Sequence, residues 1–295
     1  MATLYTHKDA NILKTWFLMF MFFVVVIALG WFISYVYDNQ AILYFAVIFS
    51  IFMNVFSYWF SDKIVLSMYR AIPVTNESHP DLYNIVENLS ITAGLPMPKV
   101  YVIPDPAPNA FATGRDKNHS AVAVTQGLLE ILNRTELEGV IAHELSHIGN
   151  RDMLVSTIAV VLLGFVTLIS DFFVRSMWHR SGDRDSGSSR GNAILAIVGI
   201  IFAILAPIFA QLIQLAISRK REFLADASGA LLTRYPEGLA SALQKIQSSS
   251  LPMARANRAT AHLFIANPFG PGGKITKLFM THPPVEDRVR ALLGK

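Results

Sequence analysis

Long runs of apolar residues alternate with polar stretches along this chain of 295 residues. Four of the runs are almost free of charged side chains, and each is close to the roughly 20 residues that an α-helix needs to cross a bilayer. They cover residues 16–37, 41–60, 153–174 and 193–217. A buried core helix is the alternative for any one of them, but four runs of this length favour membrane helices.

The first two runs are predicted to form a transmembrane hairpin, because only three polar residues, 38–40, separate them. A cleaved signal peptide is the alternative for the first run. Its apolar stretch is longer than the core of a usual signal peptide, and no small-x-small cleavage motif follows it. We therefore interpret the first run as a retained anchor.

The polar stretches on either side of the last two runs are interpreted as two pieces of one soluble domain. The predicted organisation is a hairpin over 1–60, a first domain piece over 61–152, a second hydrophobic pair over 153–217 and a second domain piece over 218–295. Within the second pair, residues 181–192 are rich in Ser, Gly, Asp and Arg, which is typical of a flexible connection.

The first polar piece is predicted to hold a small sheet followed by a helix. The expected first helix covers residues 81–93, and the expected strands, rich in β-branched residues, cover 99–103, 109–114 and 120–125. Thr135 and Glu138 have the spacing of a capping box that opens the next helix. Gly149 and Asn150 would end it.

That next helix combines an apolar stripe with a metal-binding pattern. The stripe consists of Leu137, Val140, Ile141, Leu145 and Ile148. His143 and His147 belong to an H-E-x-x-H sequence, and residues four apart lie on one helix face, so both imidazoles can bind one zinc ion. Glu144 is then placed to activate the attacking water, whose pKa zinc lowers to about 7.

A catalytic zinc site needs a third protein ligand and one open position. The chain has no cysteine, which excludes thiolate ligands, disulfides and cysteine nucleophiles. Glu222 and Asp226 lie four residues apart on an expected helix, and we predict Glu222 as the third ligand. Asp226 is predicted to accept the outer N–H of His143. A solvated salt-bridged face is the alternative for this acidic pair.

Small residues on the same expected helix would let it approach the histidine helix closely. They are Ala225, Ala227, Gly229 and Ala230.

These motifs together resemble the gluzincin-type membrane metalloproteases, a group that includes the CAAX prenyl endopeptidases, and most closely the HtpX family of bacterial heat-shock proteases. The resemblance rests on N-A-F-A-T-G at 109–114, on T-x-x-E with the segment 143–152, on 218–226, and on T-H-P-P-x-x-x-R-V at 281–289. With the paired hydrophobic runs, it covers nearly the whole chain.

The resemblance implies an α+β, zincin-like (gluzincin) domain anchored by four transmembrane helices, with one Zn²⁺ per chain. It also implies an endopeptidase of the bacterial inner membrane that degrades damaged or misfolded membrane proteins under stress. The expected partners are therefore protein substrates and the lipid bilayer. The net charge of +4 is too small to argue for nucleic acid. The oligomeric state stays open.

Further residues are candidates for supporting roles. The resemblance suggests a substrate-binding edge strand, to which a peptide could add as an extra strand, at Asn109, Ala110, Phe111 and Ala112. Ordinary sheet is the alternative. His282 either donates to the oxyanion or is a surface turn residue. Asp152, Arg219 and Asp171 are also considered, and none is assigned a role.

The distribution of basic residues predicts the side of the membrane. Lys8 and Lys14 precede the first run, Lys63 and Arg70 follow the second, and the loop between has no Lys or Arg. The positive-inside rule then places the catalytic domain in the cytoplasm. Four arginines between the third and fourth runs argue the other way, so either that loop is translocated or these runs do not fully cross.

Two other functional classes fit parts of the pattern. A non-catalytic membrane adaptor with a structural zinc would not need Glu144. A transporter or channel would need polar residues in its membrane segments, and only Pro207, Gln211 and Gln214 suggest one. An endopeptidase is therefore the preferred hypothesis. The ligand types favour zinc, although other divalent metals also bind such sites in vitro.

Overall fold

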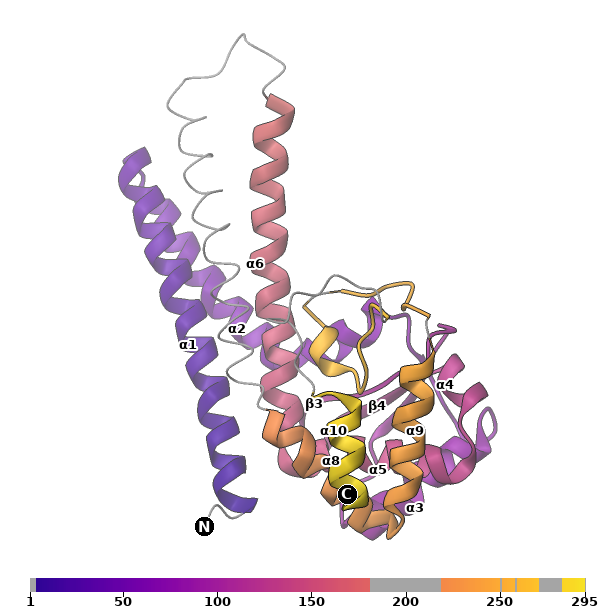
Figure 1. Cartoon of the computed structure of the whole chain (residues 1–295). Helices are drawn as coiled ribbons and strands as arrows, with labels where there is room; N and C mark the ends of the chain where they lie inside the picture. Colours follow the sequence, from indigo (N-terminus) through magenta and orange to yellow (C-terminus); the bar gives the residue numbers. More distant parts are fainter. Residues whose placement is uncertain (1–3, 181–218, 250, 258, 271–282, 295) are drawn as a thin grey trace.

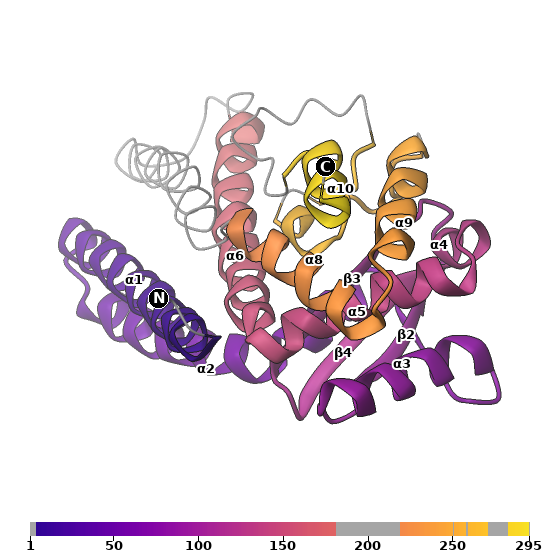
Figure 2. The same cartoon turned by 60° about the horizontal axis from the view of Figure 1, so that its bottom comes forward.

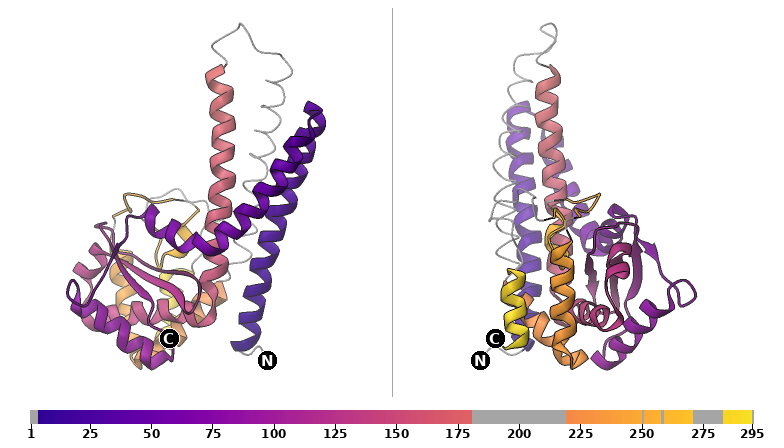
Figure 3. Two further views of the ribbon diagram at one scale, coloured as in Figure 1. Left: turned by 180° about the vertical axis from the view of Figure 1, so that it is seen from behind. Right: turned by 45° about the vertical axis from the view of Figure 1, so that its right-hand side comes forward.

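The computed structural model describes residues 4–180, 219–249, 251–257, 259–270 and 283–294. Two long helices stand beside a globular part that holds a four-stranded sheet, and a third long helix rises from the globular part in the same direction (Figure 1). These helices are α1 (Leu4–Tyr37), α2 (Gln40–Met68) and α6 (Asp152–Arg180). Figure 3 shows the same arrangement from two further sides.

Helices α1 and α2 form the predicted hairpin. Asp38 between them has a left-handed backbone conformation (φ 49°), and the side chain of Asn39 accepts a hydrogen bond from the backbone N–H of Ala41 at 3.0 Å, which caps α2. Both helices are long and apolar enough to cross a membrane, over Asn11–Tyr37 and Gln40–Met68. The two helices of the predicted hairpin are therefore present, and both extend beyond the predicted runs.

Large apolar side chains cover the outward sides of this hairpin. The most exposed aromatic residues are Trp16, Phe20, Trp31, Tyr35, Tyr44 and Phe45. Such a surface is unfavourable in water, by about 25 cal/mol for each Å² of apolar area. A lipid environment removes this cost, so the exposed face supports a membrane location.

The later membrane segments are only partly described. Helix α6 contains the third predicted run, and it follows α5 (Arg134–Asn150) after a bend of 85°. Within the described residues, a third span results only if α5 and the first part of α6 count as one broken span. The fourth run lies outside the described residues. Four transmembrane helices therefore remain a prediction.

The sheet is mixed, with the strand order β1-β2-β4-β3. The strands are β1 (Ile72–Pro73), β2 (Lys99–Ile103), β3 (Ala110–Asp116) and β4 (His119–Thr125). β2 runs parallel to β4, whereas β1 and β3 are antiparallel to their neighbours. The three predicted strands are present, with β2 at the predicted bounds, and β3 lies at one end of the sheet.

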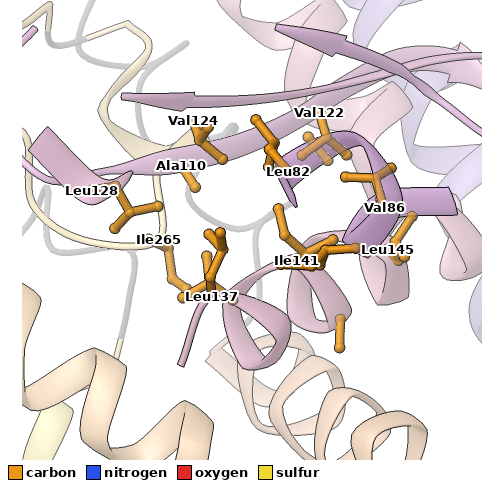
Figure 4. Packing of buried hydrophobic residues seen from close by; sticks show 14 of the residues in the cluster. Leu82, Val86, Ala110, Val122, Val124, Leu128, Leu137, Ile141, Leu145 and Ile265 are labelled. Carbon is orange, nitrogen blue, oxygen red and sulfur yellow. The ribbon is translucent and has the colours of Figure 1, made fainter. Parts of the chain in front are cut away.

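One face of the sheet packs on α5 and on α3 (Pro80–Ala93), the helix predicted over 81–93. Figure 4 shows Leu137, Ile141 and Leu145 of α5 directed toward the sheet. Their partners are Ala110, Val122 and Val124 from the strands, with Leu82 and Val86 from α3. The whole predicted apolar stripe is buried. Each buried Leu or Ile contributes about 1.5–3 kcal/mol, so the stripe fixes the rotation of α5 and directs its opposite face away from the sheet.

The capping box that opens α5 is formed by Asn133 and Glu136, so the prediction of Thr135 and Glu138 was wrong by two residues. The Asn133 side chain accepts from the Glu136 N–H at 3.0 Å, and the Glu136 carboxylate accepts from the Asn133 N–H at 2.9 Å. Glu138 instead pairs with Arg134 at 3.1 Å. Both candidates have the same spacing, and asparagine is at least as good a cap as threonine.

The second polar piece packs on the first (Figure 2). After α4 (Gln126–Ile131) and α5 in the first piece, the second contributes α8 (Arg219–Thr233), α9 (Pro236–Ser248), the short 3-10 helix η1 (Ala261–Leu263) and α10 (Val285–Leu293). Helix α8 lies so close to α5 that a Cβ atom at Gly229 would be 3.0 Å from the backbone nitrogen of His143. The predicted close approach of the two helices is confirmed at this glycine.

Glu136 joins α5 to α9, and we expect Glu136→Gln to destabilise the fold by about 1–3 kcal/mol. Its carboxylate accepts from Ser241 and from the Lys245 ammonium, both at 2.7 Å. A glutamine amide would turn a donor toward one of these donors. Urea unfolding in detergent at pH 7 measures the loss.

The loss of stability caused by Glu136→Gln should become smaller at low pH. Burial alone would raise the pKa of Glu136, but the hydrogen bonds from Lys245 and Ser241 lower it below its ordinary value. A lowered folded-state pKa means that the stabilisation is present above the unfolded value of about 4.3 and disappears as the pH falls through the folded value. Glu138→Gln is the control, and equal losses for both variants would contradict the role of Glu136.

Candidate metal centre

Three candidate ligands converge between α5 and α8. His143 and His147 lie one turn apart on α5, and their Nε2 atoms are 3.2 Å apart. Glu222, in the first turn of α8, places its Oε2 atom 3.7 Å from Nε2 of His143 and its Oε1 atom 3.7 Å from Nε2 of His147. One ligand atom from each of the three residues lies within 4.8 Å of the others. The structure thus brings together the three side chains that the sequence nominated.

These distances and donor types fit a small cation with nitrogen and oxygen ligands. Zinc bonds of about 2.0–2.1 Å in a tetrahedron hold neighbouring ligand atoms about 3.4 Å apart. The observed separations of 3.2 and 3.7 Å lie on either side of that value. Calcium would require six to eight oxygen ligands. The residues therefore fit zinc or a similar transition metal.

Each imidazole presents its other nitrogen to a buried carboxylate. Nδ1 of His143 lies 2.9 Å from Asp226, and Nδ1 of His147 lies 3.3 Å from Asp152. A carboxylate at Nδ1 keeps the hydrogen on that atom and leaves the Nε2 lone pair for a metal. The predicted contact of Asp226 is present. Asp152 had been considered without a role, and its contact with His147 now supplies one.

Arg288 holds Asp226 in place. Its side chain is fully buried and donates two hydrogen bonds to the two carboxylate oxygens, at 2.8 and 2.6 Å. Burial alone would raise the pKa of Asp226, but Arg288 and His143 outweigh it and lower the pKa to about 2. Asp226 is therefore ionised at neutral pH and can accept the His143 N–H.

The sequence analysis included Arg288 in the resemblance but gave it no role. A signal was present, because Arg288 shares one face of α10 with three apolar residues that pack on the core, Val285, Val289 and Leu292. A charged residue on the apolar face of an amphipathic helix is rarely buried without a partner.

The site favours positive charge. Burial alone would lower the pKa of His147, but Asp152 and Glu222, with a smaller contribution from Glu144, raise it to about 9. The same carboxylates would stabilise a metal cation bound there.

Glu144 lies beside the ligands and faces the sheet edge. It is 1% exposed, and its carboxylate accepts a hydrogen bond from the backbone N–H of Ala112 on β3. Burial raises the pKa of Glu144 to about 7, although the charge of His147 acts in the opposite direction. A carboxyl group with this pKa can both take up and release a proton near neutral pH.

A cavity of about 30 Å³ opens beside the ligands. This volume accommodates about two water molecules. Its lining includes Ala112, Ser156 near the start of α6, and the segment 262–265. His262 in that segment is buried, and its Nε2 lies 3.2 Å from the carbonyl oxygen of Ser156. The sequence analysis did not select His262, because nothing in its local sequence marks it.

The candidate substrate strand reaches this cavity at Ala112, but its first residues already have partners. The backbone N–H of Ile265 donates to the carbonyl oxygen of Ala110 at 3.0 Å. The side chain of Asn109 exchanges two hydrogen bonds with the backbone of Ala266, at 3.0 and 3.2 Å. A substrate role for residues 109–112 remains a prediction, and its most favourable point is Ala112, whose N–H faces Glu144.

Three other candidates fall outside what the structure describes. His282 lies in an undescribed segment, and the side chains of Asp171 and Arg219 are not described. The two alternatives for His282 stay open, and Asp171 and Arg219 stay without an assigned role.

Fold and site together are those of a membrane-anchored peptidase of the zincin type. The chain belongs to peptidase family M48, whose family model matches residues 76–295. Membership of this family implies a metal ion, and the cluster of His143, His147 and Glu222 can hold one.

Curated relatives named "Protease HtpX homolog" align with almost the whole chain. The relative from Caldanaerobacter subterraneus is 47% identical over 98% of this chain and 97% of its own length. The relative from Lactobacillus helveticus is 46% identical, over 98% and 99%. The relative from Pyrococcus furiosus is 52% identical, over 88% and 89%. The resemblance to the HtpX family is therefore confirmed, and the chain is a membrane peptidase of this type.

The fold is comparable to that of a solved structure. The crystal structure of S. mikatae Ste24p has a TM-score of 0.50 and covers 95% of this chain and 67% of its own. Its sequence is 18% identical, so it supports the shared architecture only.

We predict that Gly229→Ala weakens metal binding, because the added Cβ pushes α8 away from α5 and moves Glu222 from the imidazoles. Overpacking of this kind costs about 1–3 kcal/mol. Gly149→Ala on α5 is the matched control, since the nearest atom to its added Cβ is a Leu95 side-chain carbon at 3.9 Å. Zinc affinity and melting temperature should fall for Gly229→Ala alone. Equal zinc affinity in both variants would contradict the predicted effect.

Proposed function

We propose that this peptidase is a zinc-dependent endopeptidase that cleaves membrane proteins at the cytoplasmic face of a bacterial inner membrane. The observation that carries the proposal is the convergence of His143, His147 and Glu222 next to the buried carboxyl group of Glu144. One Zn²⁺ on these ligands would supply the Lewis acidity that activates water and polarises the substrate carbonyl.

Glu144 acts as the general base and then as the general acid. Its carboxylate takes a proton from the attacking water, and the resulting hydroxide oxygen bonds to the carbonyl carbon. The carbon–nitrogen bond then breaks, and Glu144 returns the proton to the leaving nitrogen. Burial of the Glu144 side chain raises its pKa and so favours uptake of the proton from water.

The end strand β3 offers a way to bind substrates of varied sequence. A peptide that adds to a sheet edge is held by main-chain hydrogen bonds, which do not depend on its side chains. The backbone N–H of Ala112 already points toward Glu144, so a peptide that pairs from this residue onward would pass the base. Such binding suits the removal of damaged proteins, a role that the resemblance to heat-shock proteases suggests.

The position of the site favours substrates at the membrane surface. Met153 and Ser156 line the cavity from the first turns of α6. Arg115 of β3 lies over the ring of Trp59 on α2, 4.3 Å from its centre. The cavity therefore touches α6, and the candidate substrate strand β3 touches the membrane-compatible helix α2.

The domain organisation follows from the same proposal. Residues 1–60 anchor the chain, 61–152 and 218–295 form the catalytic domain, and 153–217 insert a second hydrophobic pair. The basic residues that flank the apolar runs of α1 and α2 support a cytoplasmic catalytic domain.

The catalytic assignment is tested by comparing wild type, Glu144→Gln and Glu222→Gln, each as the full chain in detergent with an unfolded fluorescent protein as substrate. Glu144→Gln should retain one zinc per chain and lose about 10²–10⁴-fold in cleavage rate. Glu222→Gln should lose the zinc itself, as measured by metal analysis. Glu138→Gln, on the same helix, should behave as wild type.

Two results would overturn the mechanism. One is full cleavage by Glu144→Gln, and the other is zinc retention by Glu222→Gln at wild-type affinity. A chelator should abolish wild-type cleavage, and added zinc should restore it.

The orientation can be checked with single cysteines, because the chain has none of its own. Gln40→Cys lies at the first residue of α2, next to the turn between the two membrane helices, and Glu77→Cys lies in the globular part. Both positions are exposed. A membrane-impermeant maleimide added to intact spheroplasts should label Gln40→Cys only. Labelling of Glu77→Cys from outside would reverse the proposed topology.

A further inference from the structure

Behind His147 a chain of contacts leads out of the globular domain to the first membrane helix. Asp152, the first residue of α6, faces Nδ1 of His147 with its Oδ2 atom. Its other oxygen, Oδ1, accepts from Nδ2 of Asn11 at 2.6 Å and from Arg221 at 3.2 Å. Asn11 is the first residue of the membrane-compatible part of α1.

These three side chains are buried together. Asn11, Asp152 and Arg221 are 4%, 5% and 7% exposed. The Asn11 amide also donates to the carbonyl oxygen of Asn150 at 3.4 Å and accepts from Arg221 at 3.5 Å. Because both ends of the amide have partners, its orientation is fixed. Two donors on Oδ1 in turn fix the carboxylate of Asp152, and thereby the direction of Oδ2.

The two ligand imidazoles differ in where their support comes from. The carboxylate behind His143 is held by Arg288, which belongs to α10 in the globular domain. The carboxylate behind His147 is held partly from α1. The family model begins at residue 76 and so does not include this helix.

We propose that α1 is part of the metal centre and that Asn11 is a positioning residue. Together with Arg221 it holds Asp152 in the orientation that keeps the hydrogen of His147 on Nδ1 and leaves Nε2 free for the metal. This inference rests on the metal centre proposed above, and it gives the membrane hairpin a role beyond anchoring.

Packing supports the same connection. Along the shared contact, Leu18 and Phe22 of α1 lie in one buried cluster with Val155 and Ile158 of α6. This apolar contact begins less than two turns beyond Asn11 and aligns the two helices. Metal affinity therefore depends on correct docking of α1, so a chain whose hairpin is not packed would bind the metal weakly.

The test measures metal affinity rather than cleavage. Asn11→Leu has a similar volume but donates nothing to Asp152. Asp152→Asn turns an amide N–H toward His147 and drives the imidazole hydrogen to Nε2. Loss of a partner behind a metal ligand costs about 10–100-fold in affinity. We expect about 10-fold for Asn11→Leu and up to about 100-fold for Asp152→Asn.

Full-length variants in detergent are titrated with zinc against a fluorescent chelator, and their Co²⁺ forms are compared by visible absorption, which responds to ligand geometry. Thr15→Val is the matched control. Thr15 is 2% exposed, lies one turn further along α1, and donates to the backbone carbonyl of Asn11 at 2.9 Å. Its replacement should change neither zinc affinity nor the Co²⁺ spectrum.

The double variant Asn11→Leu/Asp152→Asn tests whether Asn11 affects zinc affinity through Asp152 or in another way. If Asn11 acts through Asp152, Asn11→Leu causes no further loss of affinity in the Asp152→Asn background. Additive losses would show that Asn11 acts elsewhere and would overturn the proposal. So would a zinc affinity and Co²⁺ spectrum of Asn11→Leu equal to those of Thr15→Val.

Two further measurements keep the outcome clear. If Asn11→Leu does not fold, Asn11→Ala takes its place. The rise in melting temperature on adding zinc then distinguishes a positioning role from lost packing. A positioning role reduces that rise, whereas lost packing lowers the melting temperature equally with and without zinc. His143→Ala that still binds zinc at wild-type affinity would overturn the metal centre itself, which is a different result from failure of the Asn11 variants.

Discussion

Helix α8 packs against α5 with so little space that one added carbon at Gly229 would meet the backbone of His143. The two helices are far apart in sequence, and an undescribed stretch separates α6 from α8. Their close contact nevertheless sets the distance between Glu222 and the two imidazoles. The sheet and α3 contribute by burying the apolar stripe of α5, which fixes the rotation of that helix and turns its histidines toward α8.

Around this contact the charged groups form layers. The inner layer holds the candidate ligands and Glu144, the next holds Asp152 and Asp226, and the outer layer holds Arg221 and Arg288. All of the carboxylates and both arginines are buried. Carboxylates outnumber arginines, and a buried charge without a counter-charge costs several kcal/mol. A divalent cation would restore the balance, so the stability of the site and its affinity for a metal have the same physical origin.

Local patterns predicted much of this arrangement. Spacing within a few residues predicted the histidine helix α5, strand β2 and the placement of Glu222 and Asp226 on one face of α8. Each of these features is present. Spacing could not choose between two overlapping capping boxes, so Thr135 was selected in place of Asn133. Arg288 and Asn11 were given no role for a different reason. Their partners lie 62 and 141 residues away, and a polar residue beside apolar neighbours does not show in sequence whether it meets water or a buried carboxylate.

Only Arg151, in a left-handed conformation, separates the histidine helix from α6. One peptide unit spans about 3.8 Å, so the histidine-bearing helix α5 cannot move independently of the start of α6. A change in the tilt of α6 would therefore displace His147 relative to Glu222, so the geometry of the candidate ligands depends on how this helix is seated.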